Sequence, residues 1–374
     1  MTEHHGSHRQ LLTMADGRAN AGVALDAIIV PTNRTPAYLR TAMDIAARLD
    51  CALLVLCSQR ASVADTVELG RRLGVEVIAI DVDRLPEDCL PVFETTTLLA
   101  GKPFERRTDT SLKRNLGLLF AKVAGWQRVV FLDDDIKVPD PQDLNAAAEL
   151  SDSFAGVGLA IQGYPDNSVV CHAYREVGNF QETFIGGGAL AVGVDSMTSF
   201  FPKVYNEDWF FLLDDQELRP TAVTGHAVQK PYDPFANETR ARTEEFGDCL
   251  AEGVFALFDN GRRIEDADSR YWRQFLRSRL ELINGVLAEV DGLDRDPAEK
   301  RRMIAALKAA RGRCMIIEPE LCVEYLVALR NDRKVWRDFV DYAPTCSGPV
   351  DALAELGLTG SARHTVRHRV PALV

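Results

Sequence analysis

The chain has 374 residues, a formal net charge of −12 and 46% hydrophobic residues. That length predicts one large domain with a smaller one, or two domains, and the composition excludes a disordered or collagen-like chain. The acidic balance argues against a nucleic-acid-binding protein, because phosphate contacts supply most of the affinity of such proteins.

Two further classes of protein are not expected from the composition. The longest apolar runs are far shorter than the roughly 20 residues of a membrane span, and the first residues lack the apolar stretch of a signal peptide. We therefore expect a cytoplasmic protein without a transmembrane segment. The eight cysteines form no CxxC pair, so zinc-ribbon spacing is absent and the thiols are expected to be reduced and mostly buried.

The order of patterns along the chain predicts four regions. Residues 1–22 are polar and without periodicity, and are expected to be a flexible N-terminal tail. Residues 23–240 carry the chemistry-bearing motifs, residues 241–345 form a helical C-terminal region, and residues 346–374 form a tail.

Short apolar runs alternate with helical periodicity from residue 23 onward. Strands are predicted at 27–30, 52–57, 75–80 and 129–132, with helices at 37–49, 61–73 and 111–123. This alternation predicts an α/β protein whose mainly parallel, Rossmann-like sheet is flanked by helices. Further strands are expected at 157–161, 184–194 and 222–229, followed by helices over 243–342 that are interrupted at Gly292 and Pro297.

Three consecutive aspartates, Asp133, Asp134 and Asp135, directly follow the predicted strand at 129–132. Adjacent carboxylates repel one another, so a positive partner is expected. A hard divalent cation, Mg²⁺ or Mn²⁺, is a natural partner, because it takes one or two carboxylates together with substrate phosphates. The alternative is a solvated acidic turn in which one aspartate caps a helix.

Lys113, Arg114 and Asn115 open the helix that leads to this strand. A helix N-terminus favours anions, so cations there are mildly unfavourable unless an anionic ligand is bound. The alternative is that these residues are simply exposed in the first turn.

Gly186, Gly187 and Gly188 precede a run that is typical of a strand. A dinucleotide fingerprint would instead open a helix, so we reject that interpretation. The glycines indicate either a loop whose backbone approaches a ligand closely or a tight bend at the start of a strand.

Glu207 and Asp208 begin an apolar, helical run. One of them could accept a proton from an attacking hydroxyl group. Alternatively, Asn206 caps the helix and the acids merely favour its first turn. His226 lies in a strand-like run further along the chain. Its residue type allows two interpretations, a metal ligand or a hydrogen-bonded core histidine.

Together these segments resemble the glycosyltransferases of the GT-A fold, in the style of the large family-2 group, over roughly residues 26–232. The segments that carry the resemblance are the loop after the first strand, the "ARN"-like helix start, the DxD-like triplet, the glycine loop and the "ED"-like pair: Ile28–Arg34, Lys113–Asn115, Phe131–Asp135, Gly186–Gly188 and Glu207–Asp208.

The resemblance implies a role for each segment. The donor nucleotide would meet Pro31, Thr32, Asn33, Arg34, Lys113, Arg114, Asn115, Asp133, Asp134 and the glycines Gly186, Gly187 and Gly188. Asp135, together with Asp133, would hold the metal, and Asp208, beside Glu207, would be the catalytic base. His226 resembles an extra metal ligand of some GT-A enzymes, including those that make glucosyl- or mannosyl-phosphoglycerate. The second strand ends in Ser58-Gln59, where many relatives carry an acidic residue that reads uracil.

The sequence therefore predicts a cytoplasmic glycosyltransferase that depends on Mn²⁺ or Mg²⁺. It would move a sugar from a nucleotide-diphosphate donor, of UDP or GDP type, to a hydroxyl of a small soluble acceptor, with a homodimer as one possible assembly. Two alternatives stay open: a nucleotidyltransferase on a related fold, whose glycine-rich first loop is missing here, and a non-catalytic nucleotide-sugar-binding protein.

Overall fold

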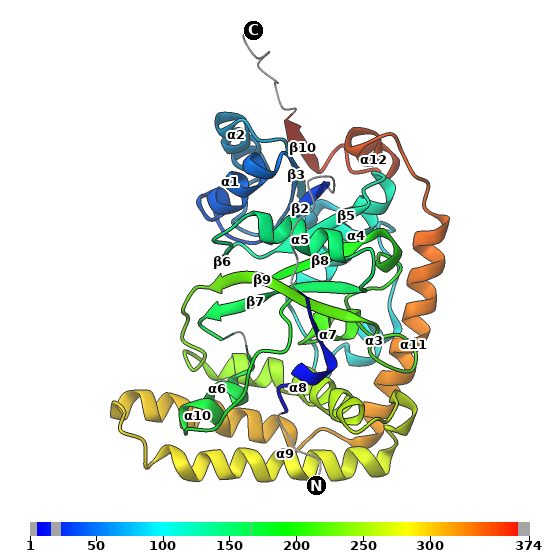
Figure 1. Ribbon diagram of the computed structural model, residues 1–374. Helices are drawn as coiled ribbons and strands as arrows, with labels where there is room; N and C mark the ends of the chain where they lie inside the picture. The colour runs from blue at the N-terminus through cyan, green and yellow to red at the C-terminus, as the bar shows by residue number, and fades with distance from the viewer. Residues whose placement is uncertain (1–5, 16–23, 166, 366–374) are drawn as a thin grey trace.

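The computed structural model describes residues 6–15, 24–165 and 167–365. Within them, one mixed sheet is covered by helices on both faces (Figure 1). Its strands are β1 (Thr13–Met14), β2 (Ala27–Thr32), β3 (Ala52–Cys57), β4 (Val77–Asp81), β5 (Arg128–Leu132), β6 (Ile136–Lys137), β7 (Gly156–Gly163), β8 (Ala189–Gly193), β9 (Thr221–Gln229) and β10 (Ala362–Thr365). The α-helices are α1 (Arg40–Leu49), α2 (Val63–Leu73), α3 (Glu94–Leu99), α4 (Thr110–Val123), α5 (Gln142–Leu150), α6 (Val169–Glu176), α7 (Glu207–Phe211), α8 (Glu238–Asp259), α9 (Ser269–Val290), α10 (Pro297–Cys314), α11 (Pro319–Tyr342) and α12 (Pro349–Glu355).

The strand order is that of an α/β protein with a mainly parallel centre. In the described residues it runs β1-β9-β7-β8-β5-β2-β3-β4-β10, with β6 also pairing with β9. Strands β4, β3, β2 and β5 are parallel neighbours, and β8 enters antiparallel between β5 and β7. The predicted fold class, a Rossmann-like, mainly parallel sheet flanked by helices, is confirmed.

The central strands are buried on both faces, which explains why they appear in the sequence as continuous apolar runs. Ile28 and Val30 of β2 point into a core shared with α1 and α5, whereas Ile29 points into the core on the opposite face. This alternation follows from the two-residue period of a strand.

The helical region after residue 240 shares a core with the sheet. Phe131 of β5, Phe246 of α8 and Leu329 of α11 belong to one continuous set of buried apolar side chains. Figure 1 shows α8, α9 and α10 side by side on the face of the sheet opposite to α1 and α2, with α11 running up one side. The boundary predicted near residue 240 therefore marks a change of element type and not a break in the core.

Both predicted tails are partly wrong. Within residues 6–15, His8 is fully buried and Thr13–Met14 pairs with β9 in parallel; residues 1–5 and 16–22 lie outside the described residues. At the other end, β10 pairs antiparallel with β4 after α12, so residues 349–365 are structured, and 366–374 lie outside the described part. Their pairing partners lie far away in the sequence, so no local periodicity signals them.

Two expectations on composition can be compared with the structure. All eight cysteines are free thiols, and seven of them are buried, as predicted. Among the described residues, no helix combines the length and the apolar character that a bilayer span requires.

Candidate active site

A polar cavity of about 150 Å³ lies where the carboxyl ends of β2 and β5 meet the start of α4. Ligands of open α/β sheets bind beyond the carboxyl ends of the strands, so the position is the one that the topology favours. The cavity brings together most of the residues predicted to meet the donor or the metal: Pro31, Thr32, Asn33, Arg34, Lys113, Asp133, Asp134 and Asp135, with Asp109 and Thr110. We call it the aspartate cavity.

The three aspartates have different environments. Asp134 is buried; its carboxylate accepts a hydrogen bond from Thr32 Oγ1 at 2.6 Å and lies 3.3 Å from an Arg34 nitrogen. Burial raises the pKa of Asp134, although Thr32 and Arg34 act in the opposite direction. The side chains of Asp133 and Asp135 are 35% and 25% exposed. The outer two carboxylates are therefore open to the cavity, whereas the middle one fixes the loop.

Cations compensate the aspartates, as their mutual repulsion requires. Arg34 Nη2 lies 2.7 Å from Asp135 Oδ2, and Arg114 Nη2 lies 3.5 Å from Asp133 Oδ1. Lys230, which follows β9, lowers the pKa of Asp134 through its charge, and its Nζ lies 5.7 Å from the centre of the Tyr38 ring. Lys230 and Tyr38 were not predicted as site residues, because neither belongs to a motif.

Two residues of the helix start have structural partners. Lys113 Nζ donates to Thr32 O and Ser58 Oγ at 2.9 and 2.7 Å and pairs with Asp109 at 2.9 Å, which engages all three of its donors. Asn115 lies outside the aspartate cavity; its amide donates to Phe201 O and accepts from Phe201 N. The prediction that Asn115 contacts the nucleotide is therefore replaced by a role in holding the Phe201 backbone.

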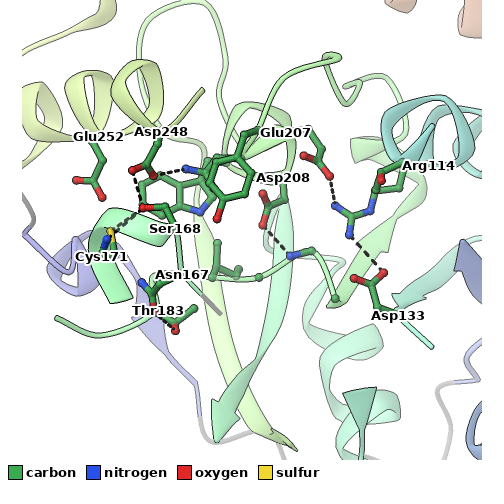
Figure 2. A pocket seen from close by; sticks show the side chains of 18 of the residues that line it. Arg114, Asp133, Asn167, Ser168, Cys171, Thr183, Glu207, Asp208, Asp248 and Glu252 are labelled. Carbon is green, nitrogen blue, oxygen red and sulfur yellow. Dashed lines mark hydrogen bonds and ion pairs between the residues drawn. The ribbon is translucent and has the colours of Figure 1, made fainter. Parts of the chain in front are cut away.

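A second cavity, of about 210 Å³, is lined by the side chains that Figure 2 shows. It gathers the glycine loop and the acidic pair that the sequence singled out, which are far apart in the chain: Gly186, Gly187, Gly188, Glu207 and Asp208. We call it the glycine-loop cavity. Asp133 and Thr110 line both cavities, so the two adjoin, and we call them together the cleft.

The glycine loop is a close backbone approach and not a dinucleotide motif, because β8 starts directly at Ala189. Gly187 N donates to Asp208 Oδ2 at 2.7 Å. A Cβ atom on Gly187 would lie 2.2 Å from Arg114 Nη1, and one on Gly188 would lie 3.2 Å from Asp133 Oδ2. The absence of side chains at Gly187 and Gly188 therefore lets the loop lie close to Arg114 and to the carboxylates of Asp133 and Asp208.

Arg114 connects the aspartate triplet to the acidic pair. It is buried, and its Nη1 lies 3.0 Å from Glu207 Oε1 while its Nη2 faces Asp133 (Figure 2). Burial acts to lower the pKa of Arg114, but the charges of Asp133 and Glu207 outweigh it and raise that pKa. Its Nε has no hydrogen-bond partner in the described structure.

Glu207 and Asp208 are both buried at the start of α7. Both acids lie in the first turn, as the alternative expected, but the Asn206 side chain does not cap that turn. Asn206 has a left-handed φ of 61° and no capping bond, and its amide donates instead to Asp248 Oδ1 at 3.3 Å. The backbone turn at Asn206 therefore directs the acidic pair into the cleft.

His226 is not brought to the aspartates. Its side chain is exposed on β9, its backbone N donates to Asp143, and it lines neither cavity of the cleft. As a candidate metal ligand it is therefore not retained. His226 was suggested as a ligand because it lies in the last strand that the sequence predicts. That pattern does not determine which way its side chain points.

The far wall of the glycine-loop cavity is formed by residues that the sequence analysis missed. Asp248 and Glu252 come from α8, Ser168 and Cys171 from the start of α6, and Asn167 precedes them (Figure 2). The available signal was a set of acids at a spacing of four within the predicted helical region, Glu244, Asp248 and Glu252.

The chain is similar to few known proteins at the level of sequence. No protein-family model matches the sequence, and no curated protein matches it. Among solved structures, the chain is similar to the mannosyltransferase PcManGT from Pyrobaculum calidifontis in complex with GDP-Man and Mn²⁺, with 15% identity and a TM-score of 0.42 over 94% of this chain and 92% of that one.

Proposed function

We propose that the protein is a metal-dependent glycosyltransferase that moves a sugar from a nucleotide-diphosphate donor to a hydroxyl of a small acceptor. One observation carries the proposal: Asp133 lines both the aspartate cavity and the cavity that holds Asp208. A diphosphate held near the aspartates would therefore direct its sugar toward a carboxylate that can act as a base.

The residues at the aspartate cavity fit a divalent cation. Asp133 and Asp135 offer hard carboxylate oxygens and are partly exposed, and Gly188 leaves room where a Cβ atom would approach Asp133. Oxygen donors of this kind suit Mg²⁺ or Mn²⁺. A cation bound there would stabilise the negative charge that develops on the leaving diphosphate.

The chain's own cations would also stabilise negative charge on the leaving diphosphate. Arg34 is one-third exposed and pairs with Asp134 and Asp135. When a cation takes over the charge of Asp135, Arg34 becomes available to donate to a phosphate oxygen in the same cavity. Arginine suits this role because its planar group presents several donors at once.

Asp208 is the candidate general base. Its carboxylate is buried and held by Gly187 N, which orients it without a flexible partner. In the proposed step, the acceptor oxygen forms the bond to the anomeric carbon, its proton passes to Asp208, and the bond from that carbon to the diphosphate breaks with its electron pair. Displacement of this kind inverts the anomeric centre.

The test is a thermal-shift panel of UDP, GDP, CDP, ADP and dTDP, each with and without Mn²⁺, on wild type, Asp135→Ala and the exposed control Asp44→Asn. A ligand at 100 times its Kd adds about 2.7 kcal/mol to the free energy of unfolding. For a chain of this length, that corresponds to an increase in Tm of roughly 3 °C. We expect one nucleotide to stabilise wild type and Asp44→Asn only with metal, and Asp135→Ala not at all.

Turnover is then measured as release of that nucleotide from its sugar conjugate. Asp208→Asn should keep the thermal shift and lose at least 100-fold in rate. If no nucleotide shows a metal-dependent shift, the proposal is wrong. Binding without turnover in wild type would instead favour the non-catalytic nucleotide-sugar-binding alternative.

A further inference from the structure

Two cationic side chains line the glycine-loop cavity in the described part of the chain, Arg106 and Arg114. Arg114 is engaged on both sides, by Glu207 and by Asp133 (Figure 2). Arg106 belongs to no motif, and the sequence does not predict it as a site residue. We propose that Arg106 forms a subsite for an oxyanion, a phosphate or carboxylate group of a substrate that occupies the cleft. The proposal rests on the function proposed above.

The contacts of Arg106 fix its guanidinium group and leave its terminal nitrogens without a hydrogen bond. Its Nε donates to Thr108 Oγ1 at 2.8 Å, and the guanidinium lies over the Tyr205 ring, 5.3 Å from the ring centre. Among the residues that the structure describes, neither Nη1 nor Nη2 donates a hydrogen bond, although the side chain is only 16% exposed. Arg106 therefore presents donors in a fixed position to whatever enters the cavity.

Glu207 does not satisfy Arg106. Its Oε1 lies 3.0 Å from Arg114 Nη1, within hydrogen-bond distance, whereas its Oε2 lies 3.9 Å from Arg106 Nη1, which is too far for a hydrogen bond. One buried carboxylate therefore faces two guanidinium groups, and Arg106 is the more weakly paired of the two. An oxyanion from a ligand would give Arg106 the acceptor that Glu207 does not supply.

The segment that carries Arg106 leads directly into α4, whose start also favours an anion. Thr110, the first residue of α4, lines the same cavity. A helix N-terminus offers unsatisfied N–H groups and a partial positive charge. Arg106 adds a formal charge and a planar set of donors that matches the oxygens of a phosphate or carboxylate group. Two separate features of this segment therefore favour the same ligand chemistry.

The opposite end of the cavity does not offer this chemistry. Asp248 lines that end and lies 2.6 Å from Arg279, but Arg279 also pairs with Glu245 at 2.9 Å. Arg279 is fully buried behind the wall and is shared between two carboxylates. It therefore has no charge to spare for an oxyanion in the cavity.

His8 is shared in the same way. Its Nε2 lies 3.2 Å from Glu252 Oε2, and its Nδ1 lies 2.5 Å from Asp259 Oδ2. Burial acts to lower the pKa of His8, but Asp259 and Glu252 outweigh it and raise that pKa to about 9. His8 is therefore charged, but both of its nitrogens face carboxylates. The observations place the oxyanion at Arg106 and not at the far end.

Two parts of the substrates carry an oxygen of this kind. The leaving diphosphate lies on one side of the proposed subsite, since Thr110 and Asp133 line both cavities. An anionic group of the acceptor would lie on the other side, beyond Asp208. The shared chemistry is the oxyanion, and the experiment separates its two sources.

Inorganic sulfate is the probe, because it is a simple oxyanion that stays soluble with Mn²⁺ or Mg²⁺. It is titrated calorimetrically at constant ionic strength into wild type, Arg106→Gln, Arg106→Lys and the control Arg107→Gln, which changes the exposed neighbouring arginine. We expect Arg106→Gln to weaken sulfate binding at least tenfold, which corresponds to about 1.4 kcal/mol. Arg106→Lys should weaken it about threefold, because the charge stays and the planar group is lost. Arg107→Gln should stay within twofold of wild type.

The source of the oxyanion is then read from enzyme loaded with metal and the nucleotide that the thermal-shift panel identifies. If the nucleotide blocks sulfate binding, and Arg106→Gln weakens the nucleoside diphosphate at least tenfold but the monophosphate less than twofold, Arg106 binds the diphosphate. If sulfate still binds to the loaded enzyme, and Arg106→Gln leaves the nucleotide affinity within twofold of wild type, Arg106 binds an anionic group of the acceptor. Both results support the subsite.

Three results would overturn it. These are absence of sulfate binding to wild type, a sulfate affinity of Arg106→Gln within twofold of wild type, and an equal loss in Arg107→Gln. If thermal unfolding shows that Arg106→Gln does not fold, Arg106→Lys decides, and an unchanged affinity in that variant contradicts the subsite. Absence of any nucleotide binding would instead overturn the proposed function, while the sulfate titration still tests the subsite by itself.

Discussion

Gly187 is the position where a single methyl group should disturb the whole cleft. A Cβ atom there would lie 2.2 Å from Arg114 Nη1 and 2.6 Å from Cζ, well inside van der Waals contact. Gly187 does not have a positive φ, so Gly187→Ala adds no backbone strain of the left-handed kind. The buried guanidinium has to move, and its pairs with Glu207 and Asp133 are disturbed with it.

The expected cost follows from the kind of contact. Overpacking a buried site typically costs about 1–3 kcal/mol. An entropy of unfolding of about 2.1 cal/mol/K per residue makes each kcal/mol worth roughly 1.3 °C in this chain, so Tm should fall by about 1–4 °C. A shift of Arg114 also misaligns the groups around the sugar, and we expect nucleotide release to slow by about 100-fold.

Thermal unfolding and initial rates measure the two effects, with Gly285→Ala as the control. Gly285 lies in α9, and a Cβ atom there meets nothing within 4 Å. That substitution should therefore stabilise the protein by about 0.5–1 kcal/mol through helix propensity. The reasoning is refuted if Gly187→Ala costs the same stability in an Arg114→Ala background as in wild type, because the steric partner would then be a different group.

Three further predictions concern charges. Asp134→Ala should lower the free energy of unfolding by about 1–3 kcal/mol, because the buried hydroxyl of Thr32 loses the carboxylate that accepts its hydrogen bond; urea denaturation measures this, and a neutral result would contradict the structural role of Asp134. His8 has a pKa raised to about 9, so its stabilisation is fully present below about pH 6.5 and lost as the pH rises through 9. The stability difference between wild type and His8→Gln should then shrink by roughly 3 kcal/mol from pH 6 to pH 10, and a constant difference would show that His8 is neutral in the fold. Arg34→Gln should tighten binding of Mn²⁺ alone about threefold and weaken nucleotide diphosphate binding about tenfold, that is by about 1.4 kcal/mol, in calorimetric titrations; parallel changes in both affinities would argue against competition between Arg34 and the cation for Asp135.

The central sheet and the aspartate triplet could be predicted because their signals are local. Strands β2, β3 and β5 are continuous apolar runs, and Asp133–Asp135 directly follow one of them. The resemblance also assigned Arg34 and the aspartates to one donor-binding site. The structure places them 2.7 Å apart.

What the sequence did not predict depends on contacts between distant residues. His8 reaches Asp259 across 251 positions, and nothing in a polar N-terminal stretch signals that one histidine is buried. Likewise, Asn115 and Lys113 carry the residue types of a ligand site, but their partners are backbone and neighbouring loop groups. The sequence shows that these residues are of a type that can bind a ligand. The direction in which each side chain points depends on tertiary packing, which the sequence does not show.

The two outermost pairings of the sheet have a consequence for biosynthesis. Strand β1 comes from the start of the chain and covers part of the outer edge of β9, while β10 comes from its end and covers β4. An unpaired strand edge is a template for aggregation. Because β10 is synthesised long after β4, the β4 edge stays open during most of the synthesis that separates them, and β1 has to wait about 200 residues for β9. We therefore expect nascent chains to depend on chaperones late in synthesis.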